Sequence, residues 1–120
     1  MSQKKSAAKT SKLLTSVFFS FCWLTSASSQ ADDITIMQKN RQFLLNGDKI
    51  KSIIIHVGDT LHFQNDDPFY HNIFSLSDLN TFDLGSIPTG QSRSTTFDKA
   101  GTLEVECAIH PEMILEVIVK

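Results

Sequence analysis

The strongest constraint on the fold is a series of short apolar stretches that runs from residue 34 to the end of the chain. Several of these stretches alternate apolar and polar residues with a period of two, which is typical of strands with one buried face. Turn signals such as Asn46-Gly47-Asp48 separate them, and no stretch shows a helical period. The predicted strands are 34–38, 42–45, 51–57, 60–64, 70–76, 93–97, 102–107 and 113–120. Short strands at this spacing predict an all-β sandwich or barrel.

The first 31 residues have a different character. Four lysines precede a mostly apolar run from Leu13 to Leu24, and small and polar residues follow up to Ala31. This layout predicts a secretory signal peptide over residues 1–31, cleaved after Ala31, and a single domain over residues 32–120. The alternative is an uncleaved membrane anchor, but a run of 12 residues is short of the roughly 20 that a span needs. We therefore expect a periplasmic protein whose mature form has no membrane span.

Removal of this segment changes both the charge and the cysteine count. It takes away four of the 11 Lys and Arg and none of the 13 Asp and Glu, so the remaining 89 residues carry a formal charge of −6. A nucleic-acid-binding protein needs a basic face, and this charge argues against one. Cys22 is also removed, which leaves Cys107 as the only thiol of an exported domain. Because exported cysteines normally form disulfides, a lone one indicates a thiol that is paired between chains or bound to something.

Cys107, His110 and Met113 have the spacing C-x2-H-x2-M and lie between the last two predicted strands. Chance places His and Met at these distances after either cysteine in roughly 1 of 600 chains of this composition. Alternation puts Cys107 and Met113 on the apolar faces of their strands, and His71 is in phase with Ile73. The sequence therefore offers four candidate metal ligands: His71, Cys107, His110 and Met113.

Two imidazoles, one thiolate and one weak thioether form the donor set of blue-copper electron-transfer sites. The thiolate suits both Cu(I) and Cu(II), and the thioether is too weak to impose the geometry that either state prefers. These residues predict one bound copper ion. A structural zinc site is an alternative, although such sites usually use four strong nitrogen or sulfur ligands. Taken singly, each residue also has an ordinary structural role, such as a buried cysteine that packs as a small hydrophobe.

The chain from about Ile50 to Lys120 resembles the cupredoxin family. Residues 57–67, followed by His71-Asn72, are similar to the plastocyanin pattern, and the loop from Cys107 to Met113 resembles that of amicyanins and related small cupredoxins. The resemblance implies a Greek-key β-sandwich with copper near one end. It carries over the four candidates as ligands: His71, Cys107, His110 and Met113.

The same resemblance implies a supporting role for Asn72, whose backbone N–H would bond the cysteine sulfur and whose side chain would tie the two ligand loops together. Glu112 departs from the amicyanin pattern, in which an apolar or aromatic residue is commoner at this place. The departure bears on the choice of partner and not on the metal.

The resemblance further implies an electron-transfer protein, not an enzyme, in which one copper cycles between Cu(II) and Cu(I). The electron would pass through the exposed edge of His110, flanked by Ala108, Ile109 and Pro111. We expect a monomer that docks briefly on a redox partner protein such as a cytochrome or a dehydrogenase. The alternative is a copper-binding module for delivery or storage, and a small copper oxidase would need more than the four histidines present.

The remaining polar candidates carry weaker signals. His56 and His62 alternate against apolar neighbours, so we expect them to be structural or surface residues. Asp66 and Asp67 lie in a turn, where capping of the turn is the commoner role and binding of a hard cation the rarer one.

Overall fold

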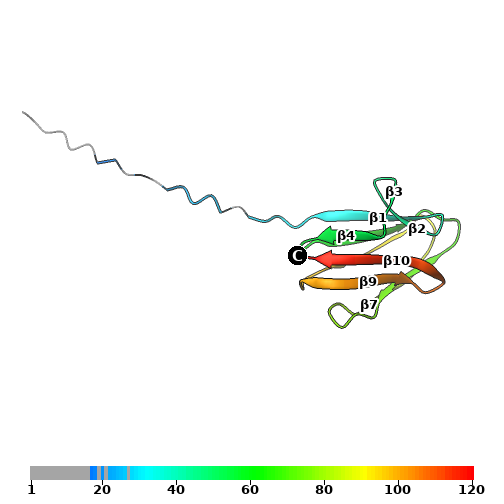
Figure 1. Cartoon of the computed structure of the whole chain (residues 1–120). Coiled ribbons are helices and arrows are strands. Elements are labelled where there is room, and N and C mark those ends of the chain that lie inside the picture. The colour runs from blue at the N-terminus through cyan, green and yellow to red at the C-terminus, as the bar shows by residue number, and fades with distance from the viewer. Residues whose placement is uncertain (1–16, 19, 21, 27) are drawn as a thin grey trace, which may run out of the picture.

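The computed structural model describes residues 17–18, 20, 22–26 and 28–120. Strands form the whole of the regular structure in this part of the chain. They are β1 (Asp33–Lys39), β2 (Gln42–Leu45), β3 (Asp48–Lys49), β4 (Ser52–Ile55), β5 (Thr60–Asn65), β6 (His71–Ser75), β7 (Phe82–Ile87), β8 (Ser92–Thr96), β9 (Gly101–Cys107) and β10 (His110–Val119). They form two five-stranded sheets that pack as a sandwich (Figure 1).

The two sheets have the strand orders β3-β2-β1-β5-β8 and β4-β10-β9-β6-β7. Each sheet contains one parallel pair, β1 with β5 and β4 with β10, and the other pairs are antiparallel. Neighbours in a sheet are often distant in sequence, as β6 is from β9. Such crossovers between the sheets are typical of Greek-key sandwiches.

The core lies between the inner faces of the two sheets. Strand β5 shows how the sequence builds it, because Leu61 and Phe63 are fully buried while the residues between them are partly exposed. Val105 and Leu115 face them from β9 and β10, and both are also fully buried. Each such side chain contributes about 1.5–3 kcal/mol through its removal from water. The period-two pattern of the sequence is therefore the origin of the sandwich.

All eight predicted strands are present, and the all-β sandwich prediction is confirmed. Two strands were not predicted. Strand β3 has only two residues, and β7 contains Gly85, whose φ of +70° is unusual in a strand. The register between β6 and β7 places Leu84 and Gly85 opposite Ile73 as a bulge, which hides the alternation in the sequence.

Strand β10 begins at His110, three residues earlier than predicted. His110 pairs with Cys107, but the next pair along the ladder is Ile114 with Glu106, so residues 111–113 bulge out of the register. The bulge turns what the sequence shows as a loop into a bent start of the strand. Figure 1 shows this β9–β10 connection at the end of the sandwich opposite the C-terminus.

The predicted signal peptide lies partly outside the described residues, because residues 1–16, 19, 21 and 27 are not among them. Phe18, Trp23 and Leu24 are described and are 84–91% exposed, so they add nothing to the core. Within the described residues, no helix has the length and apolar character to cross a membrane.

Candidate metal centre

Three strand ends carry the four predicted ligands to one end of the sandwich. His71 is the first residue of β6, Cys107 is the last of β9, and β10 starts at His110 and contains Met113. Because Ile73 pairs with Cys107, His71 lies on the same inner face, two residues beyond this pair. Strand pairing therefore brings together residues that are 36 positions apart in the chain.

His71 and Cys107 are in direct contact in the interior. Their side chains are 0% and 2% exposed, and His71 Nδ1 lies 3.5 Å from Cys107 Sγ. A metal ion lies about 2.0 Å from an imidazole nitrogen and about 2.3 Å from a thiolate sulfur. Two such donors at a near-tetrahedral angle would be about 3.5 Å apart. The observed distance therefore fits two ligands of one ion.

His110 stands beside this pair. The ring centroids of His71 and His110 are 5.1 Å apart, and the ring of Phe69 packs edge-on against both. Within the described residues, His110 Nε2 is buried and has no hydrogen-bond partner. Buried polar atoms without a partner are uncommon because desolvation is costly. Either nitrogen of a neutral imidazole can bind a metal, so an ion would supply the missing partner.

Met113 lies in the bulge of β10, next to Ile114, whose partner on β9 is Glu106. Glu106 directly precedes Cys107, so the backbone of Met113 lies near the end of β9, and Met113 is only 2% exposed. Among the described residues, no three His, Cys, Asp or Glu side chains form a ready-made metal cluster. The arrangement is instead a close pair, His71 and Cys107, with the imidazole of His110 beside it and the buried Met113 farther along β10. This soft and borderline donor set suits copper.

Asp67 was not predicted to take part in this centre. Its Oδ2 lies 2.8 Å from His71 Nε2, and both side chains are almost completely buried. The same carboxylate accepts the backbone N–H groups of Asn40 and Arg41, at 2.6 and 3.1 Å. Turn capping was the predicted role, and Asp67 does cap a turn, but that turn joins β1 to β2 and is distant in sequence. The spacing of four residues between Asp67 and His71 is the one sequence signal of their contact.

The burial of this pair changes the acidity of both groups. Burial lowers the pKa of His71, against the opposing effect of Asp67, so the imidazole favours the neutral form that binds metals. For Asp67, burial acts to raise the pKa, but the hydrogen bonds from His71, Arg41 and Asn40 outweigh it. The pKa of Asp67 therefore lies below its ordinary value of 3.8, and the carboxylate is ionised at neutral pH.

Solved structures of known proteins resemble this sandwich. It superposes on a reduced Cu(I) form of an amicyanin mutant with a TM-score of 0.64 and 23% identity, over 73% of this chain and 82% of that one. The oxidised state of another amicyanin mutant gives a TM-score of 0.63 at 24% identity with the same coverage. A Cu-containing nitrite reductase from Thermus scotoductus matches at 24% identity and a TM-score of 0.63, over 73% of this chain and 22% of that chain. No protein-family model and no curated protein matches the chain. The chain has a cupredoxin-like fold.

The cupredoxin-like fold does not bring the expected support from Asn72. Its Oδ1 is buried and has no hydrogen-bond partner among the described residues, so this atom does not tie the two ligand loops together as expected of the side chain. Asn65 connects a different pair of segments, the loop before His71 and the end of β7. Its amide nitrogen donates to the carbonyl groups of Phe69 and Ile87, and its Oδ1 accepts the N–H of Asp67. Asn65, the last residue of β5, therefore supports the His71 side of the candidate centre.

The other two histidines pair with aspartates elsewhere on the cupredoxin-like domain. The ring of His56 is 67% exposed and lies 3.8 Å from Asp59. His62 Nε2 lies 3.0 Å from Asp33 on the neighbouring strand β1. These partners agree with the predicted structural or surface roles.

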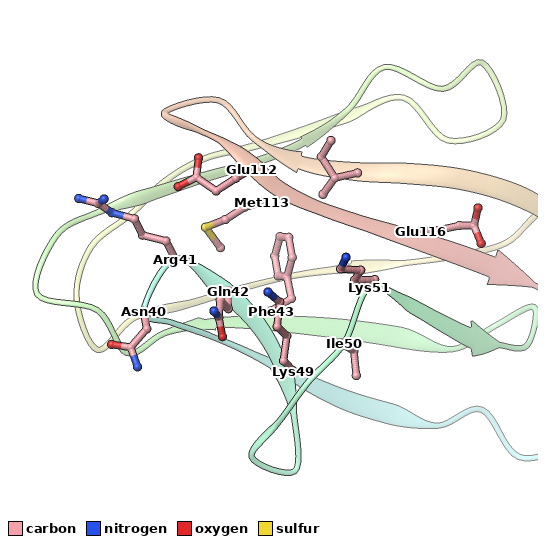
Figure 2. A pocket seen from close by; sticks show the side chains of 11 residues that line it. Asn40, Arg41, Gln42, Phe43, Lys49, Ile50, Lys51, Glu112, Met113 and Glu116 are labelled. Carbon is pink, nitrogen blue, oxygen red and sulfur yellow. The ribbon is translucent and has the colours of Figure 1, made fainter.

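A groove of about 560 Å³ opens between β2, β3 and β10. Figure 2 shows Met113 extending from β10 toward this space, with Phe43 and Arg41 nearby. Met113 is the only predicted ligand that lines it. The groove therefore borders the thioether side of the candidate centre and does not contain the centre.

Proposed function

We propose that this chain is an exported type 1 (blue) copper protein that carries single electrons. The observation that carries the proposal is the buried contact of 3.5 Å between Cys107 Sγ and His71 Nδ1, beside His110, whose Nε2 has no partner in the part of the chain that the structure describes. One copper ion would be held by four side chains: His71, Cys107, His110 and Met113. Bound copper supplies one-electron chemistry by cycling between Cu(II) and Cu(I).

The four side chains would bind the copper through donor atoms of different strength. The thiolate of Cys107 is the soft, charge-donating ligand, and the two neutral imidazoles provide donors of intermediate strength. The thioether of Met113 is the weak ligand that tunes the potential. His71 and Cys107 sit at the ends of paired strands in a packed core, so they keep their positions when the charge of the ion changes.

The surface around His110 supports the transfer of electrons to another protein. His110 is partly exposed, and the neighbouring residues Ala108 and Pro111 are exposed, as is Ile109 at 38%. Brief redox encounters use small interfaces, so a small apolar area such as this one would suffice for docking. We propose that a redox partner protein, such as a cytochrome or a dehydrogenase, docks here on a monomer. The net charge of −6 after removal of residues 1–31 would steer a basic partner.

The proposed location is the periplasm. Residues 1–31 would direct export as a signal peptide and would be removed by cleavage after Ala31. The sequence of residues 1–31 supports this, with its lysines followed by an apolar run. The mass of the exported protein tests it. A mass that corresponds to residues 32–120 is expected, and a membrane-bound product of full length would contradict it.

Absorption and EPR spectra of the copper-loaded protein test the function. A Cu(II)–thiolate bond gives an intense visible band, which a reductant should remove and an oxidant restore through many cycles. Fast electron self-exchange with slow copper release is expected of a carrier, whereas fast release would favour the delivery alternative. A copper-loaded protein that is colourless would overturn the proposal.

A further inference from the structure

Asp67 contacts the proposed copper ligand His71 through the ring nitrogen that does not face Cys107. His71 uses its two ring nitrogens differently, since Nδ1 lies 3.5 Å from Cys107 Sγ and Nε2 lies 2.8 Å from Asp67 Oδ2. The side chains of His71 and Asp67 are 0% and 3% exposed. The imidazole is therefore held between a thiol and a carboxylate, out of contact with water.

The surroundings of Asp67 fix its carboxylate in place. It accepts the backbone N–H groups of Asn40 and Arg41, whose φ values of +53° and +56° are uncommon for residues other than glycine. Successive N–H groups in such a turn form a concave site for an anion. The backbone of Asp67 is held as well, because its N–H donates to Asn65 Oδ1 and its carbonyl accepts the Thr89 hydroxyl.

These contacts determine which nitrogen of His71 carries the proton. Both oxygens of the carboxylate already accept backbone N–H groups, so the carboxylate acts as an acceptor and the nitrogen at 2.8 Å from it is the N–H donor. In a neutral imidazole the other nitrogen is then free of hydrogen. That nitrogen is Nδ1, which faces Cys107 Sγ. The position of Asp67 thus selects the tautomer that can bind a metal next to the thiol.

We propose that Asp67 is a positioning residue that locks the metal-binding tautomer of His71 and lowers the reduction potential of the copper through its charge. The inference rests on the proposed copper site. A carboxylate behind an imidazole makes it a more basic ligand. The more highly charged Cu(II) gains more from this than Cu(I), so the oxidised form is favoured.

The test is the substitution Asp67→Asn in the full-length protein, which keeps the size of the side chain and removes its charge. We expect the affinity for Cu(II) to fall about 10- to 100-fold. The affinity for Cu(I) should fall less, so the potential rises by about 59 mV for each tenfold difference between the two losses. A potential equal to that of the unchanged protein would overturn the role in tuning.

The matched control is Asp59→Asn. Asp59 is also buried and also accepts two backbone N–H groups, from Asp32 and His56, but it lies at the other end of β5. Its substitution should reduce stability and leave the potential and the copper affinities unchanged. Equal shifts in both variants would show that loss of structure, and not the charge on His71, is responsible.

A measurement without copper separates this inference from the proposed function. Nitrogen-15 NMR of the metal-free protein reports which nitrogen of His71 is protonated. We expect the proton on Nε2 in the unchanged protein and a mixture of tautomers in Asp67→Asn, because an amide can donate as well as accept. A proton on Nδ1 in the unchanged protein would overturn the inference even if Asp67→Asn fails to fold. If the protein binds no copper, the proposed function fails, and this tautomer result still decides the positioning role.

Discussion

The two ends of strand β5 each hold a buried aspartate that caps a distant piece of backbone. Asp59 precedes the strand and accepts the N–H groups of Asp32 and His56 at 2.8 and 2.7 Å. Asp67 follows the strand and accepts two N–H groups of the turn Asn40-Arg41. Both carboxylates have a lowered pKa, because hydrogen bonds to the charged form are present at both ends. The two aspartates therefore have the same structural role, which is to accept backbone N–H groups at the ends of β5.

The ends differ in the histidine beside each aspartate. At the Asp59 end, the ring of His56 is 67% exposed and 3.8 Å from the carboxylate, so water screens the interaction. At the Asp67 end, His71 is fully buried, lies 2.8 Å from the carboxylate and has Cys107 on its other side. The comparison teaches that an aspartate near a histidine is not a metal centre in itself. Burial and a soft donor on the second nitrogen distinguish the candidate centre.

The largest effect is expected from Cys107→Ser, which removes the soft donor. A hydroxyl in place of the thiolate cannot form a copper–sulfur bond, so the intense visible band of the copper-loaded protein should be lost completely. The measurement is the absorption spectrum after addition of Cu(II). His56→Ala at the opposite end is the control and should leave the band intact. A Cys107→Ser variant that remains blue would show that the ligand assignment is wrong.

The next effect concerns stability at the two ends. Asp67→Ala leaves the buried His71 ring and two part-buried N–H groups without their acceptor, and an unsatisfied buried group costs about 1–3 kcal/mol. We expect the free energy of unfolding of the metal-free protein to fall by at least this amount in urea titrations. Asp59→Ala should also destabilise the protein.

Copper binding separates these two variants. The visible band should change in Asp67→Ala and keep its position in Asp59→Ala. If the visible band is unchanged in both variants, Asp67 has no more influence on the copper than Asp59 has, and the proposed functional difference between the two ends of β5 is wrong.

The sequence predicted the sandwich and the four candidate ligands because both leave local patterns. Alternation in segments such as 102–107 is a direct trace of a buried face, and the structure confirms it with Leu103, Val105 and Cys107 in the core. The C-x2-H-x2-M spacing is equally local. The ligand assignment itself stays a prediction, although the structure brings His71 and Cys107 together.

The features that were missed depend on contacts between distant segments. Asp67 accepts hydrogen bonds from the N–H groups of Asn40 and Arg41, which are 27 and 26 residues away. The sequence of the turn 65–68 does not predict these long-range bonds. The expectation for Asn72 came from resemblance, and the bonds of Asn65, which link Phe69 to Ile87, were not predicted. Strand β7 was missed because the bulge at Gly85 breaks its alternation. Tertiary pairing determines all three, so a single sequence does not reveal them.

A smaller effect is expected from pH. The backbone N–H of Asp32, and next that of His56, lower the pKa of Asp59 below 3.8, so its folded form binds a proton less readily than its unfolded form. The stability that this gives is fully present above pH 3.8 and is lost as the pH falls through the folded pKa. Urea titrations of the metal-free protein between pH 5 and about pH 2 measure it. Asp59→Asn should show a shallower decline than the unchanged protein, and an equal decline would contradict the assignment.

The smallest effect is expected from Lys39→Ala, which removes an ion pair next to the Asp67 turn. Lys39 Nζ lies 3.3 Å from Asp66 Oδ2, but both side chains are nearly half exposed. Exposed pairs of this kind contribute about 0–1 kcal/mol, so the free energy of unfolding should change by no more than that. The reduction potential should also stay the same, since water and salt screen a charge at this surface. A potential shift as large as that of Asp67→Asn would show that any charge near this end of β5 acts on the metal, and the distinction between the buried and the exposed carboxylate would fail.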